Sequence, residues 1–128
     1  MTFLRTSVLL ALVLCVSAPT LAAPPGTAQN FLDRANRLKA KGPFALLDGD
    51  YGRLKAEATA AGESIGNDRI AAERAGRPIL YCSPQPRAQL GDYEFLDGLA
   101  AIPAGERATM SLKEAMLHVL QRKYPCRR

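Results

Sequence analysis

The chain has 128 residues, enough for one domain of ordinary size, and no internal repeat or low-complexity tract indicates a second. Its 17 lysines and arginines outnumber its 12 aspartates and glutamates, which gives a formal net charge of +5. This basic balance is mild, and no aromatic side chains are regularly interleaved with the basic ones. The composition therefore argues against a nucleic-acid-binding protein.

The first 22 residues have the pattern of a secretory signal peptide. A short start with one basic side chain, Arg5, precedes an unbroken apolar run over residues 8–16, and small residues follow. The run is too short to cross a bilayer as a stable helix. We expect cleavage after Ala22, which leaves an exported domain over residues 23–128 with no membrane association. Cys15 is removed with the leader.

Two helices are predicted in the first half of this domain. The first begins at the N-cap candidate Thr27, ends at Gly42, and repeats apolar residues at helical spacing: Phe31, Ala35 and Leu38. Residues 44–47 form a compact apolar patch of about one helical turn. The second helix covers residues 51–75 with a thin, alanine-rich stripe. Its glycines at 62 and 66 predict either one bent helix or two helices that break there.

A pair of carboxylates stands before the second helix, in Asp48-Gly49-Asp50. Such a pair invites comparison with a calcium-binding loop. The spacing fails, because Gly52 and Thr59 occupy positions where that loop needs ligands. We therefore predict that Asp50 caps the helix instead.

Two shorter helices are predicted in the second half, after an irregular connection over residues 79–91. Asp92 is the N-cap candidate of the first, which ends before Pro103. The second begins at Ser111, which forms a capping box with Glu114, and ends by residue 124 because a proline follows. Four or five helices without a convincing strand predict an all-α fold, a small helix bundle.

Two cysteines remain after cleavage, Cys82 and Cys126. An even pair in an exported chain predicts a disulfide, since compartments outside the cytoplasm are oxidising. The bridge would tie the end of the last helix to the middle of the chain. In the chain-entropy model it stabilises the fold by about 4 kcal/mol.

No catalytic constellation is visible in the sequence. His118 follows Glu114 by four residues, and such a pair could perform acid–base chemistry, but a simple contact along the helix is the commoner outcome. A zinc site from Cys82, Cys126 and His118 lacks a fourth ligand and ranks below the disulfide. We therefore predict no enzyme, no metal and no cofactor.

The remaining candidate for function is the polar connection over residues 83–92. Two prolines stiffen it and Cys82 fixes one end, so it would lose little entropy on binding a partner protein. A plain connection between helices is an equally good interpretation of the sequence. The predicted partner-contacting residues are the polar ones of this stretch: Gln85, Arg87, Gln89 and Asp92.

The cysteine motifs and the helices between them resemble a known family. Cys82-Ser83-Pro84 is followed by an amphipathic helix ending at Pro103, a capped helix, and the sequence Tyr124-Pro125-Cys126. This order resembles the Rap/Tai family of immunity proteins of bacterial type VI secretion. The resemblance extends over residues 31–126 and is sharpest from residue 81 onward.

The resemblance implies a periplasmic helical protein that binds a secreted peptidoglycan amidase and occludes its active site. It also implies that a loop between helices makes the inhibitory contacts, and that the chain can form a homodimer. Our alternative from a different class is a periplasmic helical chaperone or envelope scaffold without a toxin partner. The amphipathic helices alone are compatible with either function.

Overall fold

The computed structural model describes residues 21–84 and 88–127. The predicted signal peptide over residues 1–22 lies outside this part, apart from its last two residues. The helices are α1 (Ala28–Ala40), the 3-10 helix η1 (Gly42–Leu47), α2 (Gly49–Arg74), α3 (Asp92–Ala100), α4 (Ala104–Arg107) and α5 (Leu112–Lys123). No strand occurs in the described part, and the predicted all-α class is confirmed.

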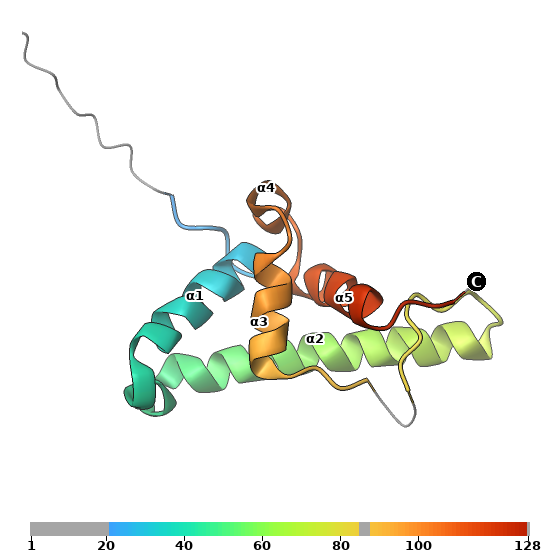
Figure 1. The fold of residues 1–128 in the computed structure, drawn as a ribbon, viewed down its shortest axis with the longest axis horizontal. Coiled ribbons are helices and arrows are strands. Elements are labelled where there is room, and N and C mark those ends of the chain that lie inside the picture. The colour runs from blue at the N-terminus through green and yellow to red at the C-terminus, as the bar shows by residue number, and fades with distance from the viewer. Residues whose placement is uncertain (1–20, 85–87, 128) are drawn as a thin grey trace, which may run out of the picture.

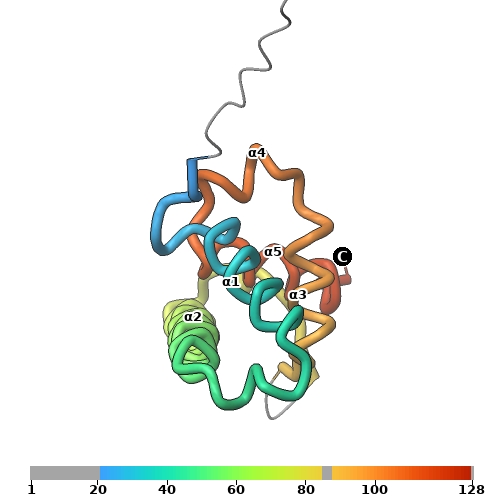
Figure 2. The backbone as a smooth tube through the Cα atoms, turned by 90° about the vertical axis from the view of Figure 1, so that its left-hand side faces the viewer, coloured from blue at the N-terminus to red at the C-terminus, as the bar shows by residue number. Residues whose placement is uncertain are grey.

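The helices form a layer on one side of α2, which is the longest of them and runs along the molecule (Figure 1). In Figure 2, α2 is seen end-on, and α1, α3 and α5 all lie to one side of it. The core fills the space between these four helices. Leu99 and Ala115 are fully buried there, and the rings of Phe31 and Phe95 meet with their centroids 5.7 Å apart.

The two predicted caps at Thr27 and Ser111 are confirmed, and the structure brings them together. Thr27 accepts a hydrogen bond from the backbone of Asn30, and Ser111 forms the capping box with Glu114. The backbone of Ala28 also donates to the carbonyl of Met110 at 2.9 Å. The starts of α1 and α5 are therefore tied to each other as well as capped.

The long second helix is continuous. Both Gly62 and Gly66 lie inside α2, so the alternative with two helices is wrong. A Cβ atom at Gly62 would lie 3.7 Å from the sulfur of Met116, which shows how closely α5 packs on this stretch. The helix ends at Arg74, one residue before its predicted end, and Gly76 follows with a φ of 64° that suits a residue without a Cβ atom.

Two predicted caps are wrong. Asp48, not Asp50, caps α2, because its carboxylate accepts from the backbone of Asp50 at 2.8 Å. Gly91, not Asp92, is the N-cap of α3, and its N–H donates to Glu94 at 3.3 Å. Asp92 is the first residue inside that helix. In both cases the chain enters the helix one or two residues earlier than predicted.

The one-turn helix α4 was not predicted, and Arg107 explains its place in the fold. Its guanidinium donates to the carbonyls of Ala100 at 2.8 Å and of Ile102, and to the side chain of Gln29 at 2.8 Å. The first two carbonyls lie at the C-terminal end of α3, where a cation is favoured. Arg107 thus joins α4 to α3 and to α1.

The turn predicted over residues 44–47 is present as η1, but its side chains do not form a packed patch. Phe44, Leu46 and Leu47 are mostly exposed, and only Ala45 of the four packs partly against the core. The corner between α1 and α2 therefore carries apolar side chains on the surface.

Candidate functional site

The predicted disulfide is confirmed. Cys82 and Cys126 are bonded, with their Cα atoms 4.9 Å apart, and both residues are exposed. The backbone N–H of Cys82 also donates to the carbonyl of Tyr124 at 2.8 Å. The segment around Cys82 is therefore attached to the end of α5 by one covalent and one hydrogen bond.

The same segment is also attached to α2, through Arg69. The guanidinium donates to the hydroxyl of Ser83 at 2.6 Å and lies 5.2 Å from the centre of the Tyr81 ring. Tyr81 and Ser83 are both buried. The Nε atom of Arg69 lies 3.2 Å from Glu73, a charge contact without hydrogen-bond alignment. These contacts hold the segment that leads into the polar connection.

The other end of the connection is held by α5. Lys123 donates to the carbonyl of Gln89 at 2.7 Å and pairs with Glu94 at 2.6 Å. The hydroxyl of Tyr124 donates to the same carbonyl of Gln89 at 2.8 Å. The Lys123 ammonium lowers the pKa of the Glu94 carboxyl, and that carboxylate raises the pKa of Lys123. We call these contacts of Lys123 and Tyr124 with Gln89 the loop clamp.

The structure describes only two of the four predicted contact residues. Gln85 and Arg87 lie outside the described residues. Gln89 is exposed, and it enters the loop clamp through its backbone carbonyl and not through its side chain. Asp92 is exposed in the first turn of α3. Gln89 therefore lies within the clamp, three residues before Asp92.

Three residues that fix this region were not predicted to do so. They are Arg69, Lys123 and Tyr124. Each makes its decisive contact with a residue 14 to 35 positions away. The charges and aromatic rings were visible in the sequence, but no local pattern could indicate their partners.

The alternative chemistries find no support in the geometry. The carboxylate of Glu114 accepts from the backbone and hydroxyl of Ser111 at 2.8 and 2.7 Å, and these hydrogen bonds lower its pKa. It therefore serves the helix cap, while His118 is exposed on α5. Both cysteine sulfurs of the postulated zinc site are bonded to each other. Among residues 21–84 and 88–127, no three metal-ligating side chains are grouped.

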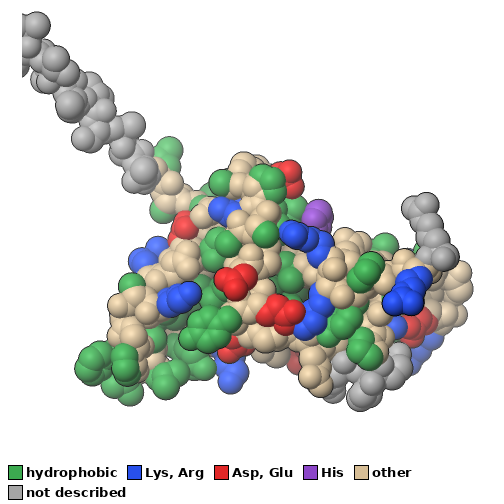
Figure 3. Space-filling view, viewed as in Figure 1, with side chains coloured by type: hydrophobic (Ala, Val, Ile, Leu, Met, Phe, Trp, Pro, Cys, Tyr) green, Lys and Arg blue, Asp and Glu red, His purple; other side chains and the backbone are tan. Residues whose placement is uncertain are grey.

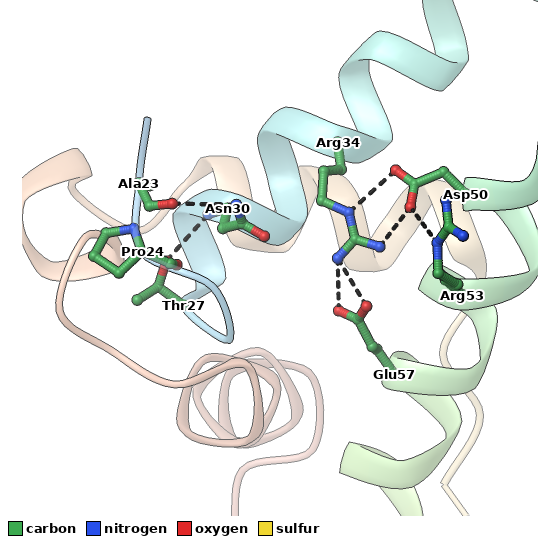
Figure 4. A network of polar contacts seen from close by, with 8 residues as sticks. All are labelled: Ala23, Pro24, Thr27, Asn30, Arg34, Asp50, Arg53 and Glu57. Atoms are coloured by element: carbon green, nitrogen blue, oxygen red, sulfur yellow. Dashed lines mark hydrogen bonds and ion pairs between the residues drawn. The ribbon is translucent and has the colours of Figure 1, made fainter. Parts of the chain in front are cut away.

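A second polar cluster lies at the other end of the molecule and is centred on Arg34 of α1 (Figure 4). Its guanidinium bonds both oxygens of Asp50, at 2.6 and 3.1 Å, and both oxygens of Glu57, at 2.7 and 3.0 Å. Arg53 adds a contact of 3.2 Å to Asp50. Hydrogen bonding to Asp50 raises the pKa of Arg34. Since both carboxylates belong to α2, the cluster joins α1 to α2.

This cluster predicts a loss of stability in acid. Hydrogen bonding to Arg34 lowers the pKa of Asp50 from 3.8 to about 2. The ionised Asp50 stabilises the fold fully when the pH is above its ordinary pKa of 3.8. This stabilisation disappears as the pH falls through the lower pKa of the folded chain. Because Asp50 is partly exposed, we expect a loss of about 1 kcal/mol of unfolding free energy between pH 4 and pH 2. Urea titrations across this range measure it.

Asp50→Asn is the matched variant for this prediction. It keeps an acceptor of similar shape but removes the titrating charge, so the fall in stability between pH 4 and pH 2 should be shallower. Asp97→Asn removes an exposed carboxylate from α3 and should leave the slope unchanged. Equal slopes for the unaltered chain and Asp50→Asn would contradict the prediction.

No family model matches the chain, and neither the curated proteins nor the solved structures provide a similar protein. The likeness to the Rap/Tai family therefore stays a prediction from short motifs. The helices of the described part include none that is long and apolar enough to cross a bilayer.

Proposed function

We propose that the protein is a periplasmic binding protein of the immunity type, which inhibits a peptidoglycan amidase by occluding its active site. The observation that carries this proposal is the attachment of the polar connection at both ends. Cys82, Ser83 and the buried Tyr81 fix its beginning, and the loop clamp fixes its end. A segment held in this way loses less conformational entropy when it docks into a cleft.

The chemistry of the exposed residues is compatible with this role. Gln89 and Asp92 are exposed beside the clamp, and both can hydrogen-bond to a partner. The clamp uses the backbone of Gln89, not its side chain. A substitution of this side chain therefore tests contact with a partner without breaking the clamp.

The proposal predicts inhibition of a cell-wall amidase by the oxidised mature chain. Candidate amidases are the exported ones encoded near this protein, and the measurement is their rate of peptidoglycan cleavage at rising concentrations of the chain. The double variant Gln89→Ala with Asp92→Ala should raise the inhibition constant by about tenfold or more, as for interface residues that contribute over 1 kcal/mol. Its unfolding free energy should change little, because both side chains are exposed.

Two further variants distinguish residues that contact the amidase from residues that only hold the connection in place. Asp97→Ala removes an exposed carboxylate of α3 farther from the clamp and should inhibit as well as the unaltered chain. Tyr124→Phe keeps the packing of the ring but removes the hydroxyl that donates to Gln89, so it should weaken inhibition. Failure to inhibit every candidate amidase contradicts the proposal. Broad suppression of aggregation of unrelated proteins would instead support a chaperone or scaffold.

A further inference from the structure

The corner formed by η1 exposes three large apolar side chains. Phe44, Leu46 and Leu47 are 73%, 68% and 84% exposed, whereas Ala45 packs partly against the core. With three residues per turn, one face of a 3-10 helix can pack inward while the others face solvent. In Figure 3 hydrophobic side chains gather at this end of the molecule. A cluster of such residues indicates a binding surface.

Positive charge is concentrated beside these side chains. The stretch from Arg34 to Glu57 holds six lysines and arginines and three acidic residues, so it carries +3 of the chain's +5. All three acidic residues are engaged: Asp48 pairs with Lys41, and the other two pair with Arg34.

Besides Lys41 and Arg53, which contact Asp48 and Asp50, three further cations of this stretch are exposed close to the corner. Arg37 and Lys39 belong to the last turn of α1, and Lys55 belongs to the second turn of α2. Lys39 lies 5.5 Å from the ring of Tyr93, whose exposed fraction is 70%. The corner thus combines apolar side chains at its tip with exposed positive charge on both helices behind it.

The shape of the corner favours one kind of occupant. The corner lies at one end of the long axis of the molecule, where the chain turns from α1 into α2 (Figure 1). A stable contact with a second copy buries about 800 Å² of each partner, more than three side chains at a protruding turn provide. A lipid bilayer accepts a few apolar side chains at its interface and attracts cations by its anionic headgroups.

We propose that the η1 corner docks on the surface of an anionic lipid bilayer. Phe44, Leu46 and Leu47 enter the interface between headgroups and acyl chains, and the exposed cations Arg37 and Lys55 contact lipid phosphates. This surface is independent of the proposed amidase inhibition. It replaces the expectation from the sequence that the mature chain has no membrane partner.

The proposal also fixes an orientation. The disulfide lies toward the opposite end of α2, whose 26 residues span about 39 Å, because Ser83, next to Cys82, contacts Arg69 there. A chain docked through η1 therefore keeps the disulfide and the start of the connection away from the membrane.

The experiment is co-sedimentation of the oxidised mature chain with vesicles. One set contains equal parts of phosphatidylglycerol and phosphatidylcholine, and the other contains phosphatidylcholine alone. We expect binding to the anionic vesicles that weakens as salt is added. The double variant Phe44→Ser with Leu47→Ser should bind at least about tenfold more weakly. Arg37→Gln and Lys55→Gln should each weaken binding by about fivefold.

Leu80→Ser is the matched control for the apolar variant. Leu80 is 60% exposed but lies beside the disulfide, and its replacement should leave vesicle binding unchanged. Circular dichroism of every variant confirms that the fold is retained. Absence of binding, equal binding to both vesicle types, or an equal loss with Leu80→Ser overturns the proposal. A dimer that the Phe44 and Leu47 variant disperses, without vesicle binding, overturns it in favour of a second copy.

Discussion

Replacement of both Cys82 and Cys126 by serine is expected to lower the free energy of unfolding by about 4 kcal/mol. The two residues are 44 positions apart, so the bridge closes a large part of the unfolded chain into one loop. A domain of this size has a total stability of the same order, between about 5 and 15 kcal/mol. Urea denaturation of the oxidised chain and of the double serine variant measures the difference.

Reduction of the unaltered chain provides the control for this prediction. Both cysteines are exposed, so a reductant in solution can reach the bond. The reduced chain should unfold at the same urea concentration as the double serine variant. A difference below about 1 kcal/mol between oxidised and reduced chains would show that Arg69 and the loop clamp hold this region without the bridge.

The substitution Gly98→Ala is expected to lower the free energy of unfolding by about 1–2 kcal/mol, because it disturbs the contact between α3 and α5. A Cβ atom at Gly98 would lie 2.7 and 2.8 Å from the two methyl groups of Val119 and 3.4 Å from its Cβ. Valine is stiff in a helix, so rotation of its side chain offers little relief. This strain exceeds the gain in helix propensity from alanine, which is about 1 kcal/mol.

Two further substitutions make this prediction specific. Gly66→Ala is the matched control, because a Cβ atom there meets nothing within 4 Å, and it should stabilise the chain by up to about 1 kcal/mol. Val119→Ala removes the clashing methyl groups, so the double variant with Gly98→Ala should cost less than the two single changes added together. Additive costs would contradict the close contact between α3 and α5. Urea denaturation of these four variants and of the unaltered chain measures the changes in unfolding free energy.

The sequence was sufficient for those elements whose signals are local. Thr27 and Ser111 cap helices through hydrogen bonds to residues three positions away. The disulfide was predictable because the expected removal of the leader would leave one pair of cysteines. These predictions succeeded because each depends on a few neighbouring residues or on simple counting.

Contacts between residues far apart in the chain decided the elements that the sequence predicted wrongly or left open. Asp50 is a plausible cap by itself, but Arg34, 16 positions earlier, engages its carboxylate, and Asp48 caps the helix instead. The glycines of α2 left open whether one helix or two would form, and the structure shows one continuous helix in which Gly62 lets Met116 pack closely. The free energy of such contacts is shared with a distant partner, which the local sequence does not identify.

The same distinction between local and long-range signals applies to the candidate site. The sequence by itself determined an all-α chain with a cysteine-linked tail and a polar connection, since helix periodicity and cysteine pairing are written into neighbouring residues and residue counts. Only the tertiary structure decided that Lys123 and Tyr124 clamp Gln89, and that Phe44 stays outside the core. Both outcomes follow from how the packed helices place residues far apart in the chain, because packing chooses which polar groups meet and which apolar side chains face solvent.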